Sequence, residues 1–553
     1  MSAATAPVAP AQGGAQRTVR RLIVYGLLFV LVVITATGVA GLLGRLLDAG
    51  TPLVRGGAAD LALSLAFALI GGPLAAVLWW AVWRRLGDAA ERSSLAWGLY
   101  LAAMYTVSLV VAASALVAAA TAGLDGQWLP SELATGIVWA AVWAWHRWMS
   151  RHPLKRPVRL FTVPYVIASA YGLVLLVSGA IGALGTLLDE ALLGATSSVL
   201  SGAPWWRIVV AALVGAAVGA LVWWWHWFRD GTRGFRTGFA AVALVVVGVL
   251  GGAALALGGI GTALWVGLRL AFDPGETFAQ VVAPLGTAVA AAAIGALVWT
   301  FHRRIAAERS ADTRQAADLV VSGLGLAGAA SGIGVIVNAT LGALVSPLVA
   351  ADTRTLLLGG IAALVVGAPV WWLHWRPTRR LAPDEITYQG RRVYLIAVFG
   401  ISAVVALIAL LVVGYRIFEF MLDATTGASL IDRVRAPLGL LLATVLVFAY
   451  HFAVWRRDRA LIASQGLAPG RRIARVVLVA ADAAPELSRA IATATGASVT
   501  VWPREAGPGG LAPAATAAPD AAALAAAFDG VTARRVLVLA GPGDRFEVVP
   551  LAD

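Results

Sequence analysis

Five of the six histidines in the chain stand three residues after an aromatic residue. An imidazole can bind a metal or a haem iron and can exchange protons near neutral pH, so these residues are the first candidates for chemistry. Two side chains three residues apart lie on the same face of a helix. The pairs are Trp143 and His146, Trp223 and His226, Trp299 and His302, Trp371 and His374, and Phe448 and His451. The spacing therefore predicts five helix ends that each carry an aromatic ring beside an imidazole.

Each pair closes an apolar segment and is followed by basic residues. This position favours a membrane-interface interpretation, in which amphipathic rings lie at the level of the lipid headgroups. One alternative is axial ligation of haem by His from two facing helices at equal depth. Another is binding of anionic lipid headgroups by the His and the Arg residues that follow it. No haem attachment motif is present, and the chain has no Cys, so the sequence predicts no metal site and no cofactor, with haem as the open alternative.

The elements that carry the pairs are long and apolar. Hydrophobic residues make up 60% of the 553 positions and charged residues 13%, against about a quarter charged in soluble domains. Apolar stretches of roughly 16 to 32 residues predict membrane-spanning helices, because lipid offers no partner for an unpaired backbone amide. The predicted spans are 22–44, 61–83, 95–120, 134–149, 161–188, 207–228, 237–268, 282–302, 317–348, 357–375, 393–421 and 437–455.

The spans pair into hairpins with a period of roughly 75 residues. The second helix of each hairpin ends in the aromatic and His pair, except in the first hairpin, where Val82 stands at the His position after Trp79. The predicted fold is an all-α polytopic membrane bundle of about 12 transmembrane helices, arranged as six hairpin repeats, with a small C-terminal α/β domain. A disordered cytoplasmic N-terminus (1–20) precedes the transmembrane domain (21–460), whose repeats are about 21–92, 93–157, 158–234, 235–314, 315–390 and 391–460.

The first helices of the hairpins are rich in small residues at regular intervals. Gly38, Gly41 and Gly44 in the first hairpin have the same spacing as Gly179, Gly182 and Gly185 in the third. Small residues every three or four positions allow helix backbones to approach closely in lipid. These glycines predict that the first helices form the interior of the bundle and that the Trp-rich second helices form its rim.

The basic residues predict the orientation in the membrane. The net charge is +13, and loops taken alternately place most Arg residues on the side of the N-terminus, for example Arg84, Arg85, Arg303 and Arg304. The positive-inside rule then predicts a multi-pass protein of the cell inner membrane with both termini cytoplasmic. Because the Arg residues flank apolar segments and do not form one basic domain, the pattern predicts no nucleic-acid partner.

The composition changes after about Ile473. Residues 475–479, 497–502, 535–539 and 546–550 predict strands, and residues 484–496 and 520–529 predict helices. Residues 470–553 therefore form a predicted cytoplasmic α/β domain, and the expectation is that it contacts another cytoplasmic protein.

The hairpin repeat and its Trp-x-x-His ending resemble a family of uncharacterised bacterial integral membrane proteins, a domain of unknown function built from tandem two-helix repeats. The resemblance covers about residues 18–460. It implies membrane location and fold, but no activity and no functional residues.

No nucleophile, base and orienting group occur at a recognisable spacing, so the sequence predicts no enzyme. The helix centres also carry almost no ionisable residues, which disfavours ion-coupled transport. The sequence favours a membrane scaffold or sensory component. The alternative is a channel or transporter for a neutral or lipidic solute that passes along a glycine-lined interior, and the third hypothesis is a membrane haem protein.

Overall fold

The protein is an integral membrane protein built almost entirely from long helices, as predicted. The computed structural model describes residues 12–49, 57–194, 204–273, 275–345, 350–379, 389–422, 429–464, 473, 475–480, 485–495, 497–503, 521–529, 531, 533, 535–540 and 546–551. Among these residues, eleven helices are long and apolar enough to cross a membrane.

The helical elements follow the predicted spans closely. In chain order they are α1 (Gln12–Leu47), α2 (Ala58–Ala66), η1 (Phe67–Gly71), α3 (Gly72–Arg85), α4 (Ala89–Arg92), α5 (Leu95–Leu124), α6 (Pro130–Arg151), α7 (Val163–Leu193), α9 (Trp205–Trp224), η2 (Trp225–Arg229), η3 (Thr232–Gly234), α10 (Gly238–Ala243), η4 (Leu244–Gly251), α11 (Gly252–Phe272), α12 (Phe278–Val282), α13 (Leu285–Ala307), α14 (Ala311–Val345), α15 (Ala350–Arg379), α16 (Gln389–Leu422) and α17 (Leu430–Ser464). Three of the labelled segments, η1, η2 and η4, are π-helical turns inside longer helices.

Two details differ from the sequence prediction. The predicted span 134–149 is helical as part of α6, but α6 is not among the eleven apolar helices, because four Trp residues, a His and Arg147 and Arg151 dilute its apolar residues. The N-terminus was predicted to be disordered up to residue 20, whereas α1 begins at Gln12. Arg and Gln are good helix formers, so the helix continues beyond the apolar segment. Residues 1–11 lie outside the described residues.

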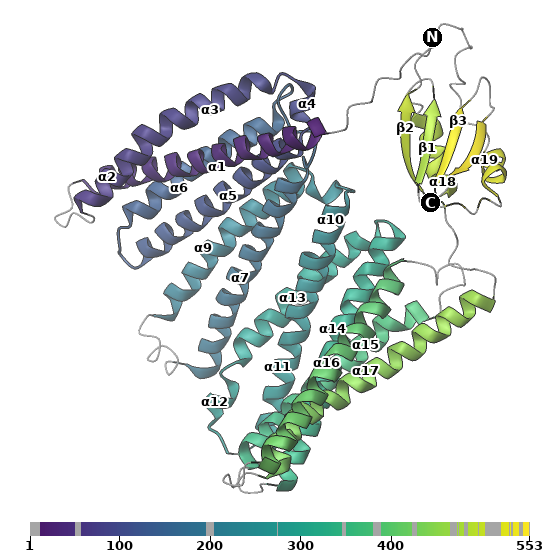
Figure 1. Cartoon of the computed structure of the whole chain (residues 1–553). Coiled ribbons are helices and arrows are strands. Elements are labelled where there is room, and N and C mark those ends of the chain that lie inside the picture. The colour runs from purple at the N-terminus through teal and green to yellow at the C-terminus, as the bar shows by residue number, and fades with distance from the viewer. Residues whose placement is uncertain are drawn as a thin grey trace. The chain divides into compact units, whose positions relative to one another are not determined.

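The hairpins pack as a row in which contacts follow the order of the chain (Figure 1). Each second helix packs against the first helix of its own hairpin and the first helix of the preceding one. The contacts are α6 with α5 and α1, α9 with α7 and α5, α13 with α11 and α7, and α15 with α14 and α11. In the sixth hairpin, Gly439 of α17 touches Gly334 of α14, which follows the same rule.

The first helices also touch one another, as α1 touches α5 and α5 touches α7. The second helices make their main contacts with first helices. The first helices therefore form the inner row and the Trp-rich second helices cover the seams between them. This is the arrangement of a stacked repeat, in which each unit buries its apolar face against its neighbours.

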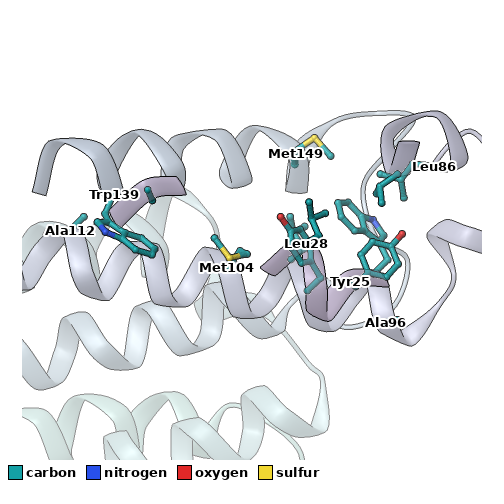
Figure 2. Packing of buried hydrophobic residues seen from close by; sticks show 13 residues of the cluster. Tyr25, Leu28, Leu86, Ala96, Met104, Ala112, Trp139 and Met149 are labelled. Atoms are coloured by element: carbon teal, nitrogen blue, oxygen red, sulfur yellow. The ribbon is translucent and has the colours of Figure 1, made fainter. Parts of the chain in front are cut away.

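The largest buried cluster joins the first two hairpins (Figure 2). Tyr25 and Leu28 of α1 pack with Trp97 and Met104 of α5, and Met149 of α6 lies in the same cluster. Aromatic rings stack in its centre, with the Trp97 and Tyr100 ring centroids 5.6 Å apart. At this end of the helices, large aromatic rings fill the space between them, whereas Gly and Ala occupy positions elsewhere along the same helices.

The C-terminal domain has the predicted α/β composition. Its elements are β1 (Arg475–Ala480), α18 (Pro485–Thr495), β2 (Ser498–Pro503), α19 (Ala521–Phe528), β3 (Arg535–Ala540) and β4 (Phe546–Leu551). The strand order is β2-β1-β3-β4, with β1 parallel to β2 and β3, and β4 antiparallel to β3. Val476 and Leu478 of the central strand pack with Ile491 and Leu524 of the helices. These residues form a hydrophobic core between the sheet and its two helices.

The described residues divide into two compact units, Met1–Arg379 with Ile401–Val447, and Arg380–Gly400 with Phe448–Asp553. The boundary passes through α16 and α17 and does not fall between residues 460 and 470. In the second unit the two helices are held together by an ion pair of 2.9 Å between Arg391 and Asp458 and by the rings of Phe399 and Trp455, 5.5 Å apart.

Candidate functional site

All five histidines of the repeated pairs are buried inside protein. The exposed fraction of His146, His226, His302, His374 and His451 is between 0% and 9%. The sequence predicts amphipathic rings at the level of the lipid headgroups, and the burial shows that protein covers these imidazoles, so they do not face lipid. The rings face other helices, because each second helix covers a seam and turns its His face toward the inner row.

The interface interpretation suits other aromatic residues of the same helix ends. Trp80, Trp145, Trp148 and Trp224 are exposed, and the Arg84 guanidinium lies 4.8 Å over the Trp80 ring. An exposed indole with a cation beside it is typical of the membrane boundary. The aromatic members of the pairs are half-buried: Trp143, Trp223, Trp299, Trp371 and Phe448.

The buried imidazoles contact tryptophans of the preceding hairpin. The ring centroids lie 6.1 Å apart for Trp79 and His146, and 6.3 Å apart for Trp143 and His226. Further along the row the distances are 5.5 Å for Trp227 and His302, and 5.8 Å for Trp299 and His374. The His of hairpins two to five therefore each receive a Trp from the hairpin before.

The first and the sixth hairpin depart from the repeated pair. The first hairpin has Trp79 but Val82 at the His position, and the sixth has His451 but Phe448 at the Trp position. Trp79 nevertheless contacts the His of the next hairpin, as the other tryptophans do.

In the third hairpin the contact is made one turn later than the pattern predicts. Trp227, and not Trp223, touches His302, while Trp223 stacks on Trp227 with ring centroids 6.2 Å apart. The π-helical turn η2 contains Trp227. A π-turn inserts one residue into the helix and rotates the side chains that follow, so the forward-facing Trp changes.

Backbone hydrogen bonds fix the tautomer of the imidazoles. The Nδ1 atoms of His146 and His226 lie 2.7 Å from the carbonyl oxygens of Val142 and Val222. A carbonyl oxygen can only accept, so Nδ1 carries the proton and Nε2 of the neutral ring is an acceptor. His302 and His374 have the same Nδ1 contact at 2.8 and 3.0 Å to the Val four residues before. In each case the backbone carbonyl oxygen of the Val in the repeated pattern accepts this hydrogen bond.

Two tyrosines of α5 form hydrogen bonds with the other ring nitrogen of His146 and His226. The Tyr100 hydroxyl donates to His146 Nε2 over 3.1 Å, and the Tyr105 hydroxyl donates to His226 Nε2 over 2.8 Å. Tyr105 also receives a hydrogen bond of 3.3 Å from Arg147 Nη1. Both ring nitrogens of these two histidines are therefore used.

A buried ion pair ties the second hairpin to the third. Arg147 donates two hydrogen bonds, of 2.7 and 2.9 Å, to the carboxylate of Asp230, whose side chain is 1% exposed. Arg151 also pairs with Asp230, and the Arg147 guanidinium lies over the rings of Trp143 and Trp225. Bidentate geometry and the burial of the Asp230 carboxylate make this a strong and specific contact.

These bonds bear on the haem alternative. An axial imidazole must offer a nitrogen lone pair to the iron, and in His146 and His226 the Nε2 lone pair already accepts from a tyrosine. Among the described residues, no three His, Asp or Glu side chains gather into a group that could hold a metal ion. In these two histidines the Nε2 lone pair is therefore used in a hydrogen bond within the protein.

The predicted glycines lie at close helix contacts with matching roles. A Cβ on Gly38 would lie 2.6 Å from the backbone nitrogen of Ala68, and one on Gly179 would lie 2.5 Å from that of Ala216, in each case on the second helix of the same hairpin. Gly41 and Gly182 also face that helix. Gly44 and Gly185 instead face the second helix of the next hairpin, at Ser131 and Thr287. Neighbouring helices therefore lie directly beside these glycines, through backbone atoms or through the small side chains of Ser64 and Ala212.

An apolar groove lies between the first two hairpins. It has a volume of about 470 Å³ and is walled by small and aliphatic residues of α1, α3 and α6, such as Val39, Ala76 and Ala141. Trp79, Tyr100, Trp145 and His146 also line it and supply its polar groups. A groove of this size and composition suits a chain-like apolar molecule.

The sequence did not single out the partners of the imidazoles. Tyr100 and Tyr105 lie within an apolar helix, and Arg147 is one of many basic residues at the helix ends. Asp230 carried a usable signal, since it is an acidic residue directly after Arg229 in a basic loop, four residues after His226. One helical turn places such a residue beside the His.

Comparison with known families supports this architecture. Residues 21–144 and 315–446 both match the family described as Domain of unknown function (DUF5671). Both segments are similar to this family. Each DUF5671 segment covers two successive hairpins, so the family unit spans four helices of this fold. No curated protein and no solved structure matches the chain. The middle pair of hairpins, 158–314, lies between the two DUF5671 segments.

Proposed function

We propose that the protein is a membrane scaffold or sensory component, in which a packed row of six hairpins carries the C-terminal domain. The observation that carries the proposal is the forward contact of Trp79, Trp143, Trp227 and Trp299 with the His of the next hairpin. Such contacts join the hairpins into one continuous element, and close glycine packing fills the interior. Both features suit a structural platform.

The proposal includes the cell inner membrane with both termini cytoplasmic, and a cytoplasmic protein as the partner of residues 470–553. The Arg-rich loops support the orientation through the positive-inside rule. Trp502 supports the partner: it is 59% exposed on β2, which is an edge strand of the sheet. Exposed aromatic residues are enriched where proteins bind each other, and an edge strand offers unpaired backbone groups.

A photo-cross-linking amino acid at Trp502 in the full-length protein tests the partner in cells. We expect one discrete cross-linked product with Trp502 replaced and none with Glu486 of α18 replaced, because Glu486 lies on a helix and not on the sheet edge. A chain that lacks residues 470–553 should lose the same partner in co-purification. If the deletion left every interaction unchanged, the role assigned to the domain would fail.

Anionic lipid headgroups are the proposed partners of the basic helix ends, which carry exposed Trp and Arg side by side. The test is the melting temperature of the protein in nanodiscs of anionic or zwitterionic lipid. Anionic lipid should raise it, and the gain should shrink when Arg84 and Arg85 are replaced by Gln. An equal melting temperature in both lipids would remove this partner.

The groove between the first two hairpins favours a second candidate function, the binding of a lipidic molecule for storage or transfer. Its walls are apolar, and Tyr100 and His146 supply polar groups. Ala141→Trp fills the groove, whereas Ala144→Trp adds the same side chain at an exposed position on the same helix that does not line the groove. Mass spectrometry of lipids retained through purification should show loss only in the first variant. Retention in both variants would exclude the groove as the binding site.

A further inference from the structure

A small cavity lies where the third hairpin meets the fourth. Its volume is about 30 Å³. The polar side chains that line it come from five elements: Ser169 of α7, Trp223 of α9, Trp227 of η2, Thr232 of η3 and His302 of α13, with Arg309 from the loop that follows α13. No Asp or Glu lines the cavity. Every formal charge in the lining is therefore positive.

The lining contains hydrogen-bond donors without acceptors. Within the described part of the chain, Nε and Nη1 of Arg309, Oγ1 of Thr232 and the indole nitrogens of Trp223 and Trp227 are buried and have no hydrogen-bond partner. Thr232 is 3% exposed. Buried polar atoms of native proteins are almost always hydrogen-bonded, and an unpaired group costs free energy. Several unpaired donors around one cavity indicate an acceptor that fills it.

The charge of Arg309 is not balanced by a nearby carboxylate. Its Nη2 donates to the backbone oxygen of Arg233 over 3.1 Å, and no ion pair involves it in the described residues. Burial lowers the pKa of the Arg309 guanidinium, and the charge of Arg236 acts in the same direction. Both effects lower the pKa because the guanidinium is a cation inside protein with no carboxylate paired to it.

Two π-helical turns form part of the cavity wall. The π-helical turns η2 and η4 both contribute to its walls, through Trp227 and through Leu244, Val247 and Gly248. Gly248 lies directly against the His302 ring, since a Cβ there would be 2.5 Å from its Cγ atom. π-turns inside helices occur frequently at functional sites, and here two of them meet at one place.

We propose that this cavity binds a small inorganic anion of the size of chloride. The donors are a guanidinium, a hydroxyl and two indole N–H groups, which is the chemistry of anion recognition. The volume has room for about two water molecules, so it suits a monatomic anion and not a phosphate ester or a lipid headgroup. The anion supplies the negative counter-charge for the Arg309 guanidinium. Because its ligands come from both hairpins, it also holds the third and fourth hairpins together.

Anion-dependent stability of the full-length protein in detergent tests the proposal. Sodium chloride is exchanged for sodium gluconate at constant ionic strength, since gluconate is too large for the cavity. A ligand that binds only the folded state stabilises it as its concentration exceeds the dissociation constant. The melting temperature should therefore rise with chloride and then saturate. Sodium phosphate at the same ionic strength should give no such rise.

Two variants and one control locate the effect. Arg309→Gln removes the cation and Thr232→Val removes the hydroxyl at nearly equal volume, and both should abolish the chloride response. Arg304→Gln removes an exposed guanidinium of the same helix end and should keep it. A chloride response that survives in both cavity variants overturns the proposal, as does an equal response to gluconate.

A direct measurement separates an anion from trapped water. Crystals grown from the wild-type protein in bromide should show an anomalous scattering peak beside Arg309 and Thr232, and crystals of Thr232→Val should not. A cavity that holds only water would give no peak in the wild type and no chloride response, and the proposal would then be wrong.

Discussion

The seam between the second and third hairpins and the seam between the third and fourth solve one packing problem in two ways. In the first, the residue after the His is Arg147, and the residue four after the next His is Asp230; the two form a buried bidentate pair. In the second, the same two positions hold Trp227 and Ala306, which pack in one apolar cluster. The positive charge there comes from Arg309, beside a cavity.

The imidazoles differ in the same way. Tyr105 donates to His226, whereas in the described residues no tyrosine hydroxyl bonds His302. We call the first seam closed, because its charged groups Arg147 and Asp230 pair with each other. We call the second seam open, because Arg309 and Thr232 retain donors without a partner; unpaired indole nitrogens occur at both seams. The comparison teaches that a repeat can keep its helix packing while the chemistry of a seam changes with two or three residues.

The largest effect is expected from Asp230→Asn. It leaves Arg147 buried with a neutral partner, so the free energy of unfolding should fall by about 3 to 5 kcal/mol. Denaturant unfolding in detergent measures it. The matched control is Asp318→Asn, which breaks a pair with Arg303 that is 3.4 Å long and half exposed, and which should cost about 1 kcal/mol or less. Equal losses would show that the closed seam has no special strength.

Gly248→Ala tests how tightly the open seam is built. The added Cβ meets the His302 ring, so the seam must open, at a cost of about 1 to 3 kcal/mol. Gly258→Ala adds the same methyl where no atom lies within 4 Å and should be neutral or slightly stabilising. A neutral result for Gly248→Ala would indicate that the second seam is loosely packed throughout.

Tyr105→Phe removes the hydroxyl donor of the closed seam and leaves Nε2 of His226 without a partner. The expected loss in the free energy of unfolding is about 1 to 2 kcal/mol. Tyr171→Phe is the control, because its hydroxyl makes an exposed contact of 3.2 Å with Ser114. Comparable values for the two variants would contradict the role given to the Tyr105 hydrogen bond.

The smallest effect is expected from Arg309→Gln in gluconate. Without an anion this guanidinium is an unpaired buried charge, so its removal should change the free energy of unfolding by about 1 kcal/mol or less, or raise it. Arg147→Gln should destabilise the protein strongly in any salt. The effect of replacing Arg309 on stability should therefore depend on chloride, and the effect of replacing Arg147 should not. The same dependence on chloride in both variants would contradict the difference between the two seams.

The helices and the C-terminal strands could be predicted because their signals are local. Apolar length defines the spans, and Val-rich runs such as Arg475–Ala480 define strands. The spacing of Gly38 and Gly44 predicted close contacts. The pairing of Tyr105 with His226 joins residues 121 positions apart, and nothing in either segment alone marks the other.

Sequence alone determined the membrane class, the hairpin repeat and the C-terminal α/β domain, because hydropathy and periodicity act within one helix or strand. Only the tertiary structure decided that the histidines are buried, that four of them receive a Trp from the hairpin before, and that Arg147 has a carboxylate where Arg309 has a cavity. Those outcomes depend on which side chains of separate hairpins meet across a seam, and seam geometry is set by helix packing and by π-turns that shift the register.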